Sequence, residues 1–190
     1  DLDEANDEIA VLDTGRFTNG QDHVRIHTTL NVRPLVDSFG THGTGPQPEV
    51  LFNTLGLGVD NTSRVWVLDG GRRDVNIWNP DGTFAFQFGV AGDAPDGFYN
   101  AVKVDFDSAG NAYILDTARY FAGNGDTDVV RVFDSSGNFL RSFGAASNFT
   151  NVTSLQVSPD DEVYIGSNGR VDIFDTMGNS LGGFGSSVDV

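Results

Sequence analysis

The sequence contains no cysteine among its 190 residues, so it has neither a disulfide framework nor a thiolate metal site. Basic residues are also scarce. Lys plus Arg number 11 against 27 Asp plus Glu, the net charge is -16, and Lys103 is the single lysine. A surface of this kind repels phosphate groups, and nucleic-acid binding needs a basic stripe that the sequence lacks. We therefore expect no nucleic-acid partner.

Long apolar runs and helical periodicity are missing as well. No run approaches the length of a membrane-spanning helix, so we expect no membrane span. No long segment repeats its apolar positions with a helical period, whereas 24 Gly and 15 Phe accompany short runs of Val, Ile and Tyr. This pattern predicts an all-β fold. The chain also begins without Met or a basic-then-apolar leader, and we expect Asp1 to be a processed or truncated start.

A repeated pattern of short strands runs through the chain. Residues 102–144 contain four segments rich in Val, Ile, Tyr and Phe, separated by Asp, Ser, Gly and Asn, which predicts a four-stranded antiparallel meander. Copies cover approximately residues 1–40, 50–89, 98–144 and 150–185, and each closes on a Phe-Gly pair. Repeats of about 40 to 50 residues with four strands each are typical of propeller blades. We expect one β-propeller domain over residues 1–190.

These copies resemble the NHL repeat family. Its motif joins a Val-x-Val-Asp strand, a Gly-Asn hairpin and a Val-Tyr-Val-x-Asp strand, seen here as VKVDFDSAGNAYILD in residues 102–116. An Arg-x-x-x-Phe strand with Asp-x-x-Gly and a Phe-Gly close follows, seen as VVRVFDSSGNFLRSFG in residues 129–144. The resemblance covers nearly the whole chain, is strongest in the third copy and implies four NHL-like repeats of a β-propeller. It implies no single function, because such propellers include binding proteins, RNA-binding modules and a few lyases.

The first copy lacks a full first strand, because only Leu2-Asp3 precedes its hairpin. Read from tail to head, the chain ends give VDVDLDEANDEIAVLD, which aligns with VKVDFDSAGNAYILD with one extra residue. Since an unpaired strand edge is costly and sticky, we expect the tail, residues 186–190, to complete the first blade. The tail pairs with its own chain, enters the next copy, or belongs to a longer tandem array. We assign this pairing to Val188, Asp189, Val190, Leu2, Ile9 and Val11.

Acidic residues recur at fixed places in the repeat. An Asp ends the second strand at Asp13, Asp69 and Asp116, and the fourth copy has Gly166 there. We interpret this Asp as an acceptor for the backbone amides that follow it. Carboxylate and amide oxygens that alternate along the chain are also typical of calcium loops. The calcium candidates are Asp105, Asp107 and Asn111 in the third-copy hairpin, Asp126 and Asp128 in its insert, and Asp1, Asp3 and Glu4 at the start.

No catalytic grouping stands out. His23, His27 and His42 all lie in the first copy, so histidines from separate repeats do not surround a central metal, although three near one another could bind zinc. The sequence has no Ser-His-Asp grouping and no phosphate-binding loop followed by a helix. We expect no enzyme activity, and a metal-dependent lyase or hydrolase of the NHL type is the catalytic alternative.

Two long inserts separate the second and third strands, at residues 14–23 and 117–128, and alternate with short connections in the other copies. Loops on a rigid scaffold often bind partners, so we expect two protruding loops on one face. The strands also carry aromatic residues that we interpret as blade-to-blade packing, namely Trp66, Trp78, Phe88, Tyr113, Phe133, Phe143, Tyr164, Phe174 and Phe184.

The acidic composition suits a marine, halophilic or extracellular setting, because excess Asp keeps a surface soluble in salt and with divalent cations, and an acidic cytoplasmic protein is the alternative. Sequons at Asn61, Asn148 and Asn151 are candidate glycosylation sites if the chain is exported by a cell that glycosylates. We therefore expect an extracellular or cell-surface location.

The leading functional hypothesis is a non-catalytic extracellular or surface scaffold. Strand addition of the tail would join copies head to tail into a polymer or filament, and another protein or a glycan is a further possible partner. The alternative is a ligand-binding or sensor propeller with a pocket at the central channel or on the long-loop face.

Overall fold

The computed structural model describes residues 2–3, 8–13, 23–28, 35–45, 47, 49–117, 128–144, 149, 151–167 and 169–185. All regular structure in these ranges is β, as the sequence predicted, and no helix in them is long and apolar enough to cross a membrane. The chain divides into two compact units, Asp1–Phe98 and Tyr99–Val190, with the boundary between the second and third repeats. A single domain over residues 1–190 stays a prediction.

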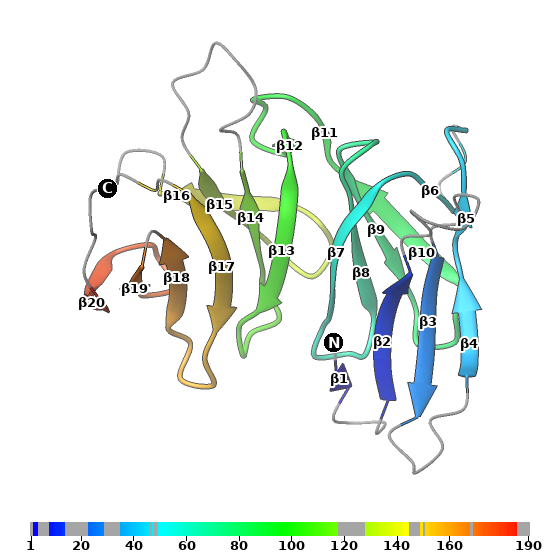
Figure 1. Cartoon of the computed structure of the whole chain (residues 1–190), viewed down its shortest axis with the longest axis horizontal. Helices are drawn as coiled ribbons and strands as arrows, with labels where there is room; N and C mark the ends of the chain where they lie inside the picture. Colours follow the sequence, from blue (N-terminus) through cyan, green and yellow to red (C-terminus); the bar gives the residue numbers. More distant parts are fainter. Residues whose placement is uncertain are drawn as a thin grey trace. The chain divides into compact units, whose positions relative to one another are not determined.

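The first unit contains two four-stranded antiparallel sheets, in which strands adjacent in sequence are adjacent in the sheet (Figure 1). The first sheet consists of β1 (Leu2–Asp3), β2 (Glu8–Asp13), β3 (His23–Thr28) and β4 (Leu35–Phe39). The second consists of β7 (Thr54–Val59), β8 (Val65–Asp69), β9 (Asp74–Trp78) and β10 (Phe84–Phe88).

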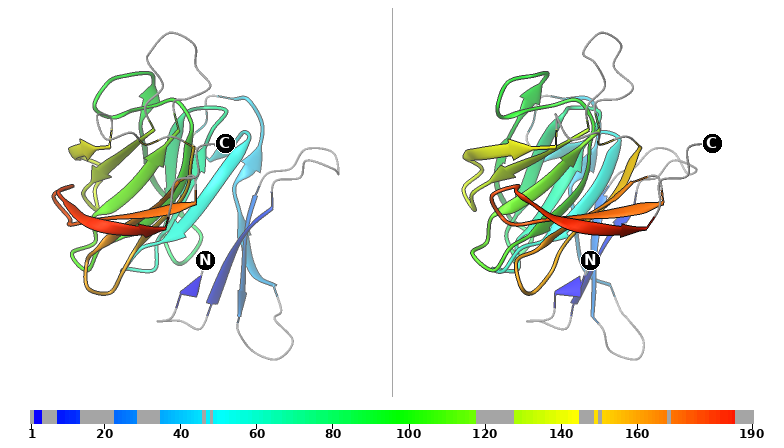
Figure 2. Two further views of the ribbon diagram at one scale, coloured as in Figure 1. Left: turned by 60° about the vertical axis from the view of Figure 1, so that its left-hand side comes forward. Right: turned by 90° about the vertical axis from the view of Figure 1, so that its left-hand side faces the viewer.

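The second unit repeats this arrangement. One sheet consists of β13 (Ala101–Phe106), β14 (Ala112–Asp116), β15 (Val129–Phe133) and β16 (Phe139–Phe143). The other consists of β17 (Val152–Val157), β18 (Val163–Ser167), β19 (Arg170–Phe174) and β20 (Ser180–Gly185). Figure 2 shows the twist of the strands within each sheet. The predicted four-stranded antiparallel meanders are therefore confirmed as sheets.

Short parallel pairs follow the first and second sheets. β5 (Thr41–His42) pairs with β6 (Val50–Leu51), and β11 (Val90–Ala91) pairs with β12 (Gly97–Phe98). Each pair ends on a fully buried apolar residue, Leu51 or Phe98. Each Gly- and Pro-rich connector therefore ends in an apolar residue that is buried in the core.

Local chemistry forms the hairpins between the third and fourth strands. Asp175 Oδ1 accepts hydrogen bonds from the backbone N of Met177 and of Asn179, both at less than 3 Å, while Gly178 has a φ of +86°. Asp134 makes the same pair of bonds in the preceding repeat. An Asp at the first position and a Gly with positive φ are what such a turn requires. The amide of Asn179 holds the pKa of Asp175 below its ordinary value.

Each unit has an apolar core between its two sheets. In the first unit the buried cluster includes Val24 from the first sheet and Val67 and Trp78 from the second. In the second unit Tyr113 and Val132 pack with Val163, Ile165 and other residues of the fourth repeat. The alternating strand pattern therefore packs one repeat against the next, as expected for a sheet that cannot cover its own faces.

Candidate functional site

The acid that ends the second strand is a structural acceptor in the second repeat. Asp69 Oδ1 accepts the backbone N–H groups of Gly71 and Arg72 at 3.0 Å, and its Oδ2 accepts the N–H of Phe52 at 2.6 Å. Burial raises the pKa of Asp69 to about 6, and the nearby Asp74 adds to the shift. The prediction that this Asp binds the amides that follow it is confirmed here, but the bond to Phe52 lies across the sheet.

Arg72 links Asp74, the acid near Asp69, to the connector between the first two repeats. Its Nε donates to Asp74 Oδ2 at 3.0 Å, and its Nη1 donates to the backbone oxygens of Gln47 at 2.7 Å and Val50 at 3.0 Å. Burial raises the pKa of Asp74, and the charge of Arg72 offsets part of that shift. Sequence reasoning missed these hydrogen bonds of Arg72, because only the fold brings the connector next to its side chain.

The equivalent acid of the third repeat also accepts amides from the segment before the neighbouring strand. Asp116 accepts the backbone N–H groups of Tyr99 and Asn100, the latter at 2.6 Å, and the Nε of Arg131 at 3.3 Å. These amides lie just before β13, as the N–H of Phe52 lies just before β7, and the turn role predicted for Asp116 concerns residues after Thr117 that lie outside the described residues. The side chain of Asp13 lies outside the described residues.

The fourth repeat needs a correction of alignment. Thr54 pairs with Asp69 and Ala101 pairs with Asp116, and in the same register Val152 pairs with Ser167. Ser167, not Gly166, therefore occupies the position of the strand-ending Asp.

The calcium candidates of the third repeat have protein partners. Asp107 accepts the backbone N–H and the side-chain amide of Asn111, both at 2.8 Å, and the hydroxyl of Tyr113 at 3.1 Å. Asp105 instead accepts the backbone N–H of Val157 at 2.6 Å, and burial raises its pKa. The two carboxylates thus bind different groups, although calcium binding there stays a prediction.

Of the remaining calcium candidates, only Asp128 has a described side chain. Asp128 Oδ2 accepts the backbone N–H of Val152 at 3.0 Å, so this acid fixes the start of β17. Asp126 lies outside the described residues, as do Asp1, Glu4 and the side chain of Asp3. Across the described ranges, no three His, Cys, Asp or Glu side chains gather as a metal site.

The predicted glycosylation sites are partly described. Asn61, in the hairpin between β7 and β8, and Asn151, just before β17, are both exposed. Asn148 lies outside the described residues, and so does most of each long insert, residues 14–22 and 118–127.

Among the described residues, β1 covers less of β2 than the first strands of the other repeats cover of their second strands. β1 pairs with β2 only where Leu2 faces Ile9 and Asp3 faces Glu8, so Val11 lies beyond its end. In the other repeats β7, β13 and β17 are six residues long and reach the last residue of the second strand. Figure 1 shows β1 as a short arrow beside β2. Val188, Asp189 and Val190, which were predicted to extend this edge, lie outside the described residues.

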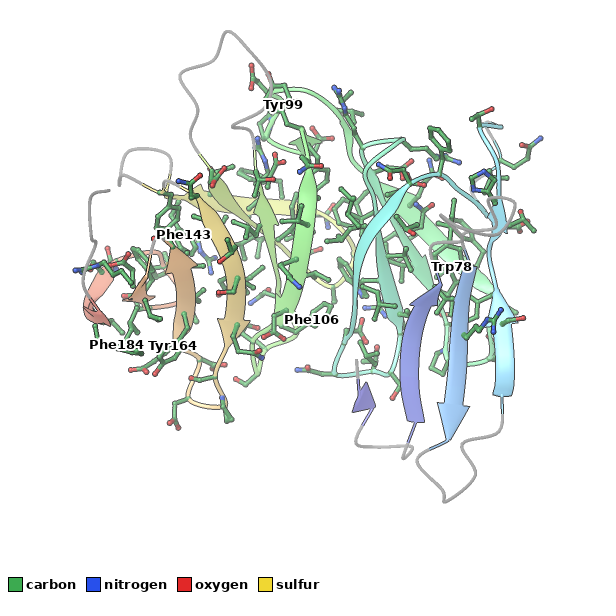
Figure 3. All side chains as sticks on the ribbon, in the orientation of Figure 1. Trp78, Tyr99, Phe106, Phe143, Tyr164 and Phe184 are labelled. Atoms are coloured by element: carbon green, nitrogen blue, oxygen red, sulfur yellow. The ribbon has the colours of Figure 1, made fainter. Side chains whose placement is uncertain are left out.

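The last strand exposes an aromatic residue that earlier repeats cover. Phe39 packs on Trp78 of the next repeat with ring centroids 5.3 Å apart, and Phe143 packs on Phe174 at 5.5 Å. Phe184, the equivalent residue on β20, is 59% exposed, and Leu181 on the same strand is 54% exposed (Figure 3). The prediction that Phe184 packs between blades is not met among the described residues. Its position in the last copy of the repeat was the signal in the sequence.

Comparisons with known proteins give matches among solved structures only. No protein-family model matches the chain, and no curated protein sequence matches it. Solved structures do match. They include a functionally unknown protein from Desulfotomaculum acetoxidans, with a TM-score of 0.64, 14% identity and 99% of this chain covered. A protein of Bacteroides fragilis assigned as exported has a TM-score of 0.61, 15% identity and 93% coverage. A streptogramin B lyase structure has a TM-score of 0.59, 10% identity and 96% coverage.

These likenesses show a β-propeller-like fold. The chain spans 56%, 46% and 60% of the lengths of those three structures, respectively. At such low identity the fold is shared, and the activity in a relative's name does not transfer with it.

Proposed function

We propose that this protein is a non-catalytic, exported β-propeller-like scaffold that assembles head to tail, with residues 186–190 of one copy adding a strand to β2 of another. The observation that carries the proposal is the two-residue β1, which among the described residues pairs only with Ile9 and Glu8, whereas the equivalent strands pair along the whole second strand. A strand edge of this kind is a template for another chain.

The tail has the sequence that this edge needs. Val188-Asp189-Val190 repeats the Val-x-Val spacing of Val102 and Val104 in β13, whose register against β14 is antiparallel. Because strand side chains alternate, two Val residues separated by one residue share a face and fix the register of the added strand. Main-chain hydrogen bonds would provide the affinity.

The opposite end of the chain offers an apolar surface. Phe184 and Leu181 are exposed on β20, whereas Phe39 and Phe143 are partly covered by the aromatic residue of a following repeat. A second copy that continues the repeat would cover Phe184 in the same way. The chain spans 46% and 56% of two of the solved propeller-like structures, so a second copy would supply a length similar to the remainder of each.

The buried acids favour a structural role over catalysis. Asp69, Asp107 and Asp116 each accept three or more hydrogen bonds from protein groups, which leaves little capacity for a substrate. Export is supported by the acidic composition and by the exported assignment of one structural relative.

Light scattering over a concentration series tests the assembly. We expect the 190-residue chain to form dimers or longer species and a chain lacking residues 186–190 to be monomeric. Changing Ser186 and Ser187 to Ala is the matched control, since it leaves the Val-x-Val segment intact. Association should strengthen as salt is raised, because each copy carries a charge of -16.

Two results would reject the proposal. The full chain could remain monomeric at every concentration, or the truncated chain could assemble equally well. A monomer that melts at a lower temperature after truncation would instead show that the tail pairs within its own chain.

A further inference from the structure

A pocket of about 480 Å³ opens in the first unit, where the end of β4 meets the hairpin between β9 and β10. Phe39, Trp78 and Phe84 form its apolar side, and Glu49, Thr41 and Thr83 lie at its polar side. Its volume falls within the range of about 300–1,000 Å³ that is usual for small-molecule sites.

The aromatic walls are held in a fixed arrangement. The rings of Phe39 and Trp78 are tilted with centroids 5.3 Å apart, and Phe84 meets Trp78 edge to face at 5.6 Å. Trp78 is only 1% exposed and lies behind the half-buried Phe39 and Phe84. The walls are therefore preorganised, because core packing fixes the central ring.

The polar side carries negative charge. Glu49 is exposed and lines the pocket, and its backbone oxygen accepts the N–H of Thr41 at 3.0 Å, which fixes its backbone beside another lining residue. Asp81, next to the lining residue Gly82, binds the hydroxyl of Thr83 at 2.6 Å. No Lys or Arg is among the residues that line the pocket.

The second unit has equivalent aromatic residues beside the corresponding hairpin. There Phe143 takes the position of Phe39, and a methyl group placed on Gly178 would lie 2.6 Å from the Phe143 ring. Phe149 packs against Phe174, the equivalent of Trp78, with ring centroids 5.5 Å apart. In the first unit Gly82, the equivalent of Gly178, lines the pocket.

We infer that this pocket binds a small organic cation with a compact apolar body, such as a quaternary ammonium group. Aromatic faces attract such cations, and a carboxylate at the mouth adds charge complementarity. The apolar body would contact Phe39 and Phe84, and the charged group would face Glu49. This site does not depend on the assembly of copies, since every lining residue belongs to one unit.

Nuclear magnetic resonance tests the inference directly, because the chain has only two Trp residues. Choline is the probe, and its neutral isostere 3,3-dimethylbutan-1-ol is the comparison. We expect choline to shift the Trp78 indole N–H signal saturably and to leave the Trp66 signal, whose N–H binds Asp60, in place. The neutral isostere should bind about fivefold more weakly or worse, as loss of a cation–aromatic attraction predicts.

Two variants locate the site. Glu49→Gln should weaken choline binding about threefold, the effect of losing one exposed charge partner. Asp160→Asn removes the same charge from an exposed position in the second unit and should change nothing. Thr41→Phe should block the pocket, and the two indole signals show whether the variant remains folded.

The inference is overturned if choline fails to shift the Trp78 signal or the isostere binds equally well. It is also overturned if Glu49→Gln and Asp160→Asn have the same effect.

Discussion

The buried carboxyl group of Asp69 should make the stability of the first unit depend on pH in an unusual direction. Asp69 is 1% exposed, and burial raises its pKa from 3.8 to about 6. The folded state therefore holds a proton on Asp69 that the unfolded state has already lost. The stabilising contribution is complete below pH 3.8 and disappears as the pH rises through about 6.

The size of the effect follows from the shift. A difference of about two pKa units corresponds to about 3 kcal/mol of unfolding free energy. Asp69→Asn removes this titration. It also places an amide N–H near the N–H of Phe52, which is 2.6 Å from Oδ2 in the native chain, so the variant should be less stable at pH 4 by about 1–3 kcal/mol. The gap between the two proteins should then narrow by up to about 3 kcal/mol between pH 4 and pH 7.

Urea unfolding followed by Trp emission measures this gap, because Trp66 and Trp78 both lie in the same unit as Asp69. Asp81→Asn is the control. Its carboxyl is exposed and its pKa is lowered by the bond from Thr83, so its loss should not change the slope above pH 4. A gap that stays constant or widens with rising pH would refute the reasoning.

Two further variants test the packing of single repeats. Asp60→Ala should destabilise the first unit by about 2–4 kcal/mol, because it leaves the buried indole N–H of Trp66 without the carboxylate that it binds at 2.8 Å. Urea unfolding measures this change in unfolding free energy, and a decrease of less than about 1 kcal/mol would contradict the prediction. Gly178→Ala should cost about 2–4 kcal/mol, since its φ is +86° and the new methyl group would meet Phe143. Gly182→Ala, at a φ of +122° with open space around it, should cost less, and thermal unfolding by circular dichroism compares the two.

The burial of Asp60 illustrates how local bonds outweigh desolvation. Burial alone pushes the pKa of Asp60 up, but hydrogen bonds from Thr62, Trp66 and Arg64 hold it below the ordinary value. Asp69 has fewer stabilising bonds and a neighbouring acid, so its pKa moves the other way. The same residue type in the same repeat thus has opposite pH behaviour, and this difference was not visible in the sequence.

The strands and hairpins were predictable because they depend on short-range chemistry. An Asp and a Gly a few residues apart form the turns at Asp134 and Asp175, and alternating Val, Ile and Phe residues form the strands beside them. Those bonds join residues two to four positions apart, so the order of residues alone determines them.

Partners and exposure were decided by the tertiary structure. Asp69 and Asp116 end equivalent strands, and each accepts a backbone amide from a residue 17 positions away, Phe52 for Asp69 and Tyr99 for Asp116, which only the folding of the sheet brings next to the acid. Phe143 and Phe184 close equivalent repeats, yet one packs on Phe174 and the other is exposed, because only one is followed by a packed repeat. The sequence by itself determined each sheet, whereas contacts between residues far apart along the chain determined what each sheet buries, binds or exposes.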